Sequence, residues 1–115
     1  MNFTTNEAMI IMEVHALLTS EPERHNDLNE LMLIYANVIS KTKLKIGFKK
    51  KYNLTLYQFH LQTRMGYAKE QLNKGLQVKV LALSLGYSTS GSFSRAFKKV
   101  YPHPPGYFRY HTSNT

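Results

Sequence analysis

Along most of the chain, apolar residues recur every three or four positions, and no stretch alternates apolar and polar residues over the length of a strand. This spacing places apolar side chains on one face of an α-helix. It predicts helices at about residues 7–18, 28–37, 41–52, 56–75, 78–85 and 90–101, and a short last helix that begins at Pro105. The expected fold class is therefore all-α, with about seven helices.

Residues whose side chains commonly cap helices stand at the expected helix starts: Asn6, Asp27, Ser40, Thr55, and Ser88 or Thr89. Gln58 completes a Thr-x-x-Gln capping box with Thr55. Gly75 can close the longest helix in a left-handed conformation. The local signals and the apolar periodicity thus predict the same boundaries.

A pattern of aromatic and basic residues occurs twice. Phe-Lys-Lys-x-Tyr, followed by six free positions and Phe, spans residues 48–59 and again residues 97–108. Each copy follows a short apolar helix, a turn of three or four residues and a helix with a hydroxyl cap, which is the order of a helix-turn-helix unit. We expect Phe48 and Phe97 to anchor two recognition helices from beneath, with the Tyr of each copy also on the buried side.

Charge is segregated along the chain. Residues 1–40 hold six acids and one basic residue, whereas the remainder holds fourteen Lys and Arg and one acid, within a net charge of +8. A field of that sign attracts polyanions, chiefly nucleic acid or an acidic membrane surface. The chain has no cysteine, which excludes a disulfide, a thiolate metal site and a thiol nucleophile.

The length of 115 residues fits one domain. We divide it into an N-terminal helix and connection (1–25), a first helix-turn-helix (26–55), a linker helix (56–75), a second helix-turn-helix with the last helix (76–109) and a tail (110–115). No apolar run approaches the roughly 18 residues that cross a bilayer, and the N-terminus lacks the basic flank and cleavage site of a signal peptide. We expect a soluble, cytoplasmic, nucleoid-associated protein with no membrane partner.

The bare faces of the two recognition helices carry residues suited to double-stranded DNA. In the major groove, the N-terminal residues of such a helix reach base edges and its basic residues lie near phosphates. The expected base-reading residues are Lys41, Thr42, Lys45, Ser90, Gly91, Ser94 and Arg95. The expected phosphate contacts are Ser40, Lys49, Lys50, Lys51, Lys98 and Lys99. A linker helix of about 17 residues spans about 25 Å, which could hold the two recognition helices in successive major grooves about 34 Å apart.

At these residues the chain resembles the DNA-binding domain of the AraC/XylS family of bacterial transcription regulators, over about residues 28–109. The most specific stretch is "LALSLGYSTSGSFSRAFKKVYPHPPGYFR", and "ISKTKLKIGFKKKYNLTLYQF" and "RMGYAKEQL" resemble the first recognition helix and the linker helix. The resemblance implies seven helices, two helix-turn-helix units, and activation or repression of promoters, usually with RNA polymerase as partner. The resemblance leaves open whether an effector-sensing domain lies outside these residues.

The first helix-turn-helix departs from the family pattern in its turn. Val38 stands where that turn usually has Gly and where Gly86 stands in the second unit. Ile34 replaces the small residue matched by Ala82. We therefore expect a wider first turn.

Two further departures concern the recognition helices. Pro102 occupies the place of a helix-ending Gly, which Asn53 can imitate in a left-handed conformation but Pro cannot. The sixth helix should therefore exit differently from the third. Ile46 holds a position where the family often has a basic residue, so base reading by the first unit would rely on Lys41, Thr42 and Lys45.

Other functions find less support in the residues. No cluster of acids at helical spacing surrounds any of the histidines at positions 15, 25, 60, 103 and 111, so no metal or other cofactor is expected. No nucleophile, phosphate-binding loop or acid pair points to an enzyme. The alternative is a basic helical module for RNA, a membrane surface or a protein partner, which kept the fold without specific DNA reading.

Overall fold

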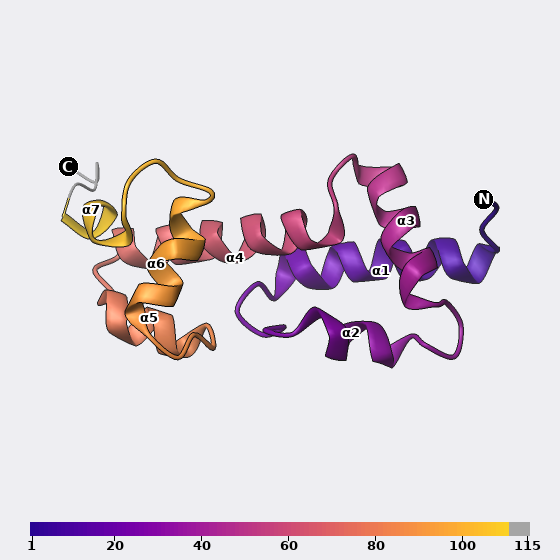
Figure 1. The fold of residues 1–115 in the computed structure, drawn as a ribbon, viewed down its shortest axis with the longest axis horizontal. Coiled ribbons are helices and arrows are strands. Elements are labelled where there is room, and N and C mark those ends of the chain that lie inside the picture. Colours follow the sequence, from indigo (N-terminus) through magenta and orange to yellow (C-terminus); the bar gives the residue numbers. More distant parts are fainter. Residues whose placement is uncertain (111–115) are drawn as a thin grey trace. The chain divides into compact units, whose positions relative to one another are not determined.

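The computed structural model describes residues 1–110, and each regular element within that range is a helix (Figure 1). The helices are α1 (Thr5–Ser20), α2 (Leu28–Ile34), α3 (Lys41–Tyr52), α4 (Leu56–Asn73), α5 (Val78–Ser84), α6 (Ser90–Lys98) and α7 (Pro105–Tyr110). The all-α class is confirmed. The chain forms two compact units, Met1–His60 and Leu61–Thr115, called here the first and second unit.

The start of α1 differs from the sequence expectation, because Thr4 and not Asn6 is the N-cap. The Thr4 hydroxyl accepts a hydrogen bond from the Glu7 backbone N–H at 3.1 Å, and the Glu7 carboxylate accepts one from the Thr4 backbone N–H at 2.9 Å. This reciprocal capping box satisfies two backbone donors, which a lone Asn6 cap cannot do. The helix therefore begins two residues earlier than the apolar pattern indicates.

The remaining caps agree with the sequence. Asp27, Ser40 and Thr89 each accept a backbone hydrogen bond at the start of α2, α3 and α6. Thr55 and Gln58 form the expected reciprocal box, with both bonds at 3.0 Å. Gly75 has φ +96° after the end of α4, as a left-handed closure requires.

Two helices are shorter than the pattern predicts. In α2 the regular structure ends at Ile34 and not at residue 37, because the chain turns through hydrogen bonds from Val38 N–H and Ile39 N–H to the Tyr35 carbonyl. In α6 it ends at Lys98 and not at residue 101. The apolar residues that follow each end continue the core without continuing the helix, so periodicity alone overextends both elements.

In the first unit, α3 packs against α1 and α2. Phe48 and Leu44 are fully buried at this junction. Gly47 faces α1 so closely that a Cβ atom there would lie 2.4 Å from Cδ1 of Ile11, which explains why a glycine stands inside a helix. The core consists of Ile11, Val14, Leu18, Leu31, Met32, Ile39, Leu44, Phe48 and Leu56.

The second unit repeats this construction with α4, α5 and α6. Phe93 and Phe97 on α6 are fully buried, as the sequence predicts. α7 closes the unit by packing against α6. The core consists of Met65, Ala68, Leu72, Leu81, Ala82, Leu85, Phe93 and Phe97.

The repeated aromatic motif has the same role in both units. Phe48 lies 4.8 Å from Tyr52 and 5.5 Å from Phe59, measured between ring centroids. Phe97 lies 4.9 Å from Tyr101 and 5.6 Å from Phe108. In each unit the first Phe lies on the buried side of the recognition helix. The last Phe belongs to the helix that follows, which is α4 in the first unit and α7 in the second.

The repeat extends beyond the motif into the helix that precedes each helix-turn-helix. In α1, His15 stacks on both Tyr52 and Phe59, with centroids 4.1 and 4.6 Å apart. In α4, the Lys69 ammonium lies over both Tyr101 and Phe108, at 4.9 and 5.0 Å from the ring centroids. In each unit, the helix that precedes the helix-turn-helix therefore covers the Tyr and the second Phe of the motif.

Candidate nucleic-acid interface

The recognition helix of the first unit is fixed at both ends by its own sequence. The Ser40 hydroxyl accepts a hydrogen bond from the Lys43 backbone N–H at 3.1 Å. Asn53 closes the helix in the left-handed region at φ +62°, and its N–H bonds to the Lys49 carbonyl at 2.8 Å. Asn tolerates this conformation better than most residues, so the expected replacement of Gly by Asn53 is confirmed.

Opposite its buried face, α3 presents a cationic surface. The exposed residues on this side are Lys41, Thr42, Lys45, Ile46, Lys49 and Lys50. Lys41 is also tied to the start of α2, because its Nζ donates a hydrogen bond to Asn29 Oδ1 at 2.9 Å. We call these six residues the α3 outer face.

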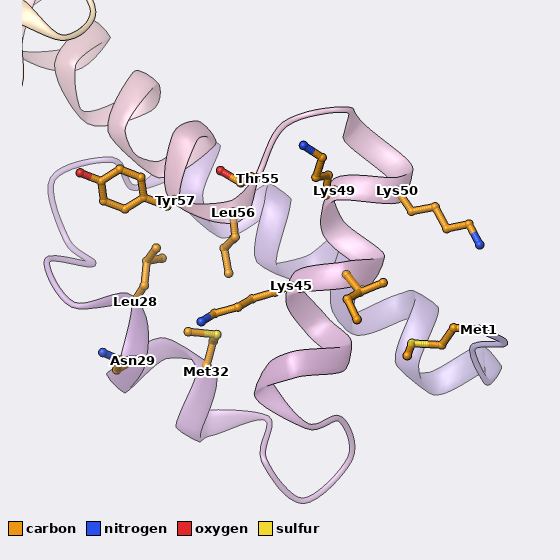
Figure 2. Close-up of a pocket in the computed structure, with 11 residues that line it drawn as sticks. Met1, Leu28, Asn29, Met32, Lys45, Lys49, Lys50, Thr55, Leu56 and Tyr57 are labelled. Carbon is orange, nitrogen blue, oxygen red and sulfur yellow. The ribbon is translucent and has the colours of Figure 1, made fainter.

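A groove with a volume of about 920 Å³ runs along the α3 outer face (Figure 2). Figure 2 shows Lys45 extending across it toward Met32, with Leu28 and Tyr57 on the opposite side. Its lining is apolar at the base and carries lysine ammonium groups: Met1, Leu28, Asn29, Met32, Lys45, Ile46, Lys49, Lys50, Thr55, Leu56 and Tyr57. A concave basic surface beside an exposed recognition helix is suited to a polyanion.

Two other lysines of α3 lie elsewhere. Lys43 faces α1, where its Nζ lies 2.8 Å from the Glu7 carboxylate and 5.5 Å from the centroid of the Phe3 ring. Lys51 is about 200° around the helix from Lys49, and it lines a small hollow with Phe3 and Ile11. Lys50 borders both this hollow and the groove, so the structure separates Lys51 from Lys49 but not from Lys50.

The recognition helix of the second unit begins with a similar cap, in which Thr89 accepts a hydrogen bond from the Ser92 N–H at 3.0 Å. Ser90, Gly91 and Arg95 are exposed on its outer side, and Ser94 is half-buried. A Cβ atom at Gly91 would lie 3.7 Å from the Arg95 guanidinium, so Arg95 reaches back along the helix over a residue without a side chain. Lys98 and Lys99 are exposed at the end of the helix.

As expected from Pro102, α6 exits differently from α3. Its C-cap, Lys99, is in the right-handed helical region and not the left-handed one. Val100 N–H and Tyr101 N–H both bond to the Phe97 carbonyl, at 3.0 Å each. This tight turn carries Tyr101 onto the core before the chain reaches the proline.

The comparisons with known proteins identify this architecture. The family model described as a helix-turn-helix domain, of AraC type, matches residues 36–111, which is more than half of the chain. The chain belongs to the AraC-type helix-turn-helix family. Its all-helical fold is that of an AraC-type DNA-binding domain.

Two individual proteins resemble this AraC-type domain. The Msm operon regulatory protein of Streptococcus mutans is 34% identical over 77 residues, which cover 66% of this chain and 28% of that protein. The chain thus matches little more than a quarter of the length of that relative. The C-terminal domain of AraT, a response regulator from Geobacillus stearothermophilus, shares the fold with a TM-score of 0.75 and 22% identity, and the match covers 92% of this chain and 93% of that one.

In the second unit of the AraC-type domain, a buried arginine holds the turn between α5 and α6. Arg64 is 4% exposed, and its guanidinium donates a hydrogen bond to the Leu85 carbonyl and lies 5.9 Å from the centroid of the Tyr87 ring. Burial lowers the pKa of Arg64, and the nearby Tyr87 opposes that shift. An arginine remains charged in either case, so the turn is fixed by a charge-assisted bond from α4.

Sequence reasoning missed Arg64 as a residue that positions the recognition helix. A signal was present, because Arg64 follows Leu61 by three residues and precedes Ala68 by four, within the apolar stripe of α4. Tyr57 was also missed. It is 57% exposed on the wall of the groove, and it occupies one of the six free positions of the repeated motif, which the pattern leaves without a role.

In the first unit, Tyr35 lies at the turn between α2 and α3. Burial, together with a hydrogen bond to Glu13 of α1 and the charge of that carboxylate, raises the pKa of Tyr35 to about 12. Tyr35 therefore stays protonated, and α1 supports this turn as α4 supports the turn of the second unit.

The turn of the first unit is one residue longer than that of the second. Residues 35–40 separate α2 from α3, whereas residues 85–89 separate α5 from α6. The expected pairing of Ile34 with Ala82 is wrong, because Ile34 is 67% exposed and Met32, two residues before the end of α2, is buried where Ala82 is buried in α5.

Within residues 1–110, no group of three or more His, Asp or Glu side chains is arranged to hold a metal ion. His111 lies outside the described residues. In the same part of the chain, no helix combines the length and the apolar character that a membrane crossing requires.

Proposed function

We propose that this AraC-type domain reads one operator with both units, by placing α3 and α6 in two successive segments of the major groove. The observation that carries the proposal is the repeated device. Each recognition helix begins at a hydroxyl cap and buries two of its own apolar side chains, Leu44 and Phe48 in α3 and Phe93 and Phe97 in α6. Each helix carries cationic side chains on its opposite side. A helix held in this way can enter the major groove without losing its core contacts.

The proposed base-reading residues of α3 are Lys41, Thr42 and Lys45. They occupy the first turns of the helix, which is the part that reaches base edges in a helix-turn-helix. Lys49 and Lys50, with Ser40 at the cap, would contact phosphates and set how deeply α3 enters the major groove of the DNA.

In α6 the proposed reader is Arg95, supported by Ser90, Gly91 and Ser94. Arg can donate two hydrogen bonds to O6 and N7 of one guanine. Because Gly91 has no side chain, the Arg95 guanidinium can lie back over the start of the helix, where a Cβ atom at Gly91 would be 3.7 Å from it. Lys98 and Lys99 would contact phosphates at the far end of the helix.

The role of the chain is binding and not catalysis, and RNA polymerase is the proposed protein partner at a promoter. The relative from Streptococcus mutans is more than three times as long as the matched region, which supports an effector-sensing segment outside these residues. Because the proposed ligand is chromosomal DNA, the proposed location is the bacterial nucleoid.

Selection of bound duplexes from a random DNA pool tests this function. We expect one enriched sequence with two half-sites, one for each recognition helix. Binding of the selected duplex should weaken in Lys49→Ala and not in Lys74→Ala, which removes an exposed lysine outside the recognition helices. Absence of enrichment, or equal affinity for RNA or anionic vesicles, would reject specific DNA reading.

A further inference from the structure

Ile46 is an apolar residue at the centre of a cationic surface. It lies in the middle of α3, and 42% of it is exposed to solvent. Lys45 and Lys49 are its exposed neighbours on the α3 outer face. The core of the first unit does not include Ile46, so packing within the unit does not account for an isoleucine here.

The repeat places Ile46 in the position of the proposed guanine reader. Ile46 precedes Lys49 and Lys50 as Arg95 precedes Lys98 and Lys99, and both residues are exposed. If Arg95 reaches a base edge, the side chain at the same helical position in α3 reaches one also. An isoleucine there can make no hydrogen bond, so it must recognise a base in another way.

Thr42 adds a second methyl group beside Ile46. The two residues are four positions apart and both are exposed, so their side chains are neighbours on the helix surface. Together they form a short apolar strip near the start of α3, with lysines on both sides. This strip lies where the base edges of a bound duplex would be.

Base edges in the major groove carry one apolar group, the C5 methyl group of thymine. We infer that Ile46 and the Thr42 methyl group recognise thymine methyl groups, so that α3 selects A·T pairs where α6 selects a G·C pair. This inference rests on the proposed function, because it applies only if α3 enters the major groove. It makes Ile46 a specificity-determining residue and not a silent replacement of a basic one.

Deoxyuridine provides a direct test, because it lacks the C5 methyl group and keeps every hydrogen-bonding edge of thymine. Each thymine of the α3 half-site in the selected duplex is replaced by deoxyuridine, and Kd is measured by fluorescence anisotropy. The wild-type chain should lose about threefold to fivefold in affinity at one or two positions, the effect of one buried methyl group. Ile46→Ala should show no loss at the position that Ile46 contacts.

Two variants serve as matched controls. Thr42→Ser removes only a methyl group and keeps the hydroxyl, so it should abolish the deoxyuridine effect at a neighbouring position. Arg95→Ala should keep the full deoxyuridine effect in the α3 half-site, because it changes the other recognition helix. Circular dichroism checks that each variant keeps its helices.

Ile46→Arg provides an independent arm. Repeating the random-pool selection with this variant should replace an A·T pair of the α3 half-site with a G·C pair and leave the other half-site unchanged. A wild-type chain that binds thymine and deoxyuridine duplexes equally well would overturn the inference, as would an equal loss in wild type and Ile46→Ala. Failure of the proposed function is distinct, since no duplex would then be selected.

Discussion

Glu7 of α1 and Lys43 of α3 form an ion pair, with the Lys43 Nζ 2.8 Å from the Glu7 carboxylate. The same carboxylate caps the first turn of α1. One side chain therefore joins the start of α1 to a recognition helix. Lys43 is thereby withdrawn from the cationic face that its sequence neighbours form.

Stability of the first unit should decrease in acid through this pair. The hydrogen bond from Lys43 and that from the Thr4 backbone lower the pKa of Glu7 in the folded state. A carboxyl group with a lowered folded pKa stabilises the fold above its unfolded pKa of about 4.3, and this contribution is lost as pH falls through the folded value. Glu7→Gln should lower the melting temperature at pH 7, and the difference from wild type should shrink below about pH 4. A difference that stays constant from pH 7 to pH 3 would contradict this account.

Loss of Arg64 should destabilise the second unit and misplace α6. Arg64→Met keeps the length of the side chain but leaves the buried Leu85 carbonyl without its donor, which should cost about 1 to 3 kcal/mol. Urea unfolding measures the cost, and DNA binding under folding conditions should weaken mainly through the half-site read by α6. Gln62→Met, an exposed substitution on the same helix, is the control and should change neither quantity. Equal loss of contacts to both half-sites would indicate a general effect on folding.

Salt dependence should separate the lysines of α3. Each phosphate contact contributes about −0.9 to the slope of log K against log salt concentration. For the whole chain we expect a slope steeper than about −2, and Lys49→Ala should make it shallower by about 0.9. Lys51→Ala should have a smaller effect, because Lys51 lies toward α1. Equal effects of the two substitutions would place Lys51 on the DNA despite its position.

Arg95→Ala should reduce discrimination between sequences and not only affinity. Removal of a bidentate donor should cost about 1 to 3 kcal/mol on the best site and relax the preference at one guanine. Lys49→Ala should weaken binding to all sequences alike. Binding curves for the selected site and for duplexes with single substitutions distinguish these patterns. A uniform loss in Arg95→Ala would make Arg95 a phosphate contact.

Much of the fold can be predicted from the sequence, because helix ends and buried faces depend on residues that are close together in the chain. The bounds of α3 follow from the hydroxyl of Ser40 and from Asn53, which satisfy backbone groups at its two ends. Phe48 and Phe97 could be placed in the core because each lies on an apolar stripe and recurs in the same motif. Such signals act within a few residues, so one sequence is enough to detect them.

Contacts between helices were harder to predict. The inward direction of Lys43 depends on Glu7, which is 36 residues away, and charge spacing along α3 gives no hint of it. Arg64 has its role because its guanidinium meets the Leu85 carbonyl across the unit. Met32, and not Ile34, is the residue of α2 that corresponds to the buried Ala82 of α5. The turn after α2 has one extra residue, and this shifts the alignment of the first unit with the second by one position.

The anchoring of each recognition helix by a Phe and a Tyr from below has an evolutionary consequence. Residues such as Ile46 and Arg95 can be exchanged without disturbing the core, since they point away from the aromatic pairs. Under the proposed function, either recognition helix can therefore change the DNA sequence that it reads without a compensating change in the core. Regulators built in this way can acquire new target genes one half-site at a time.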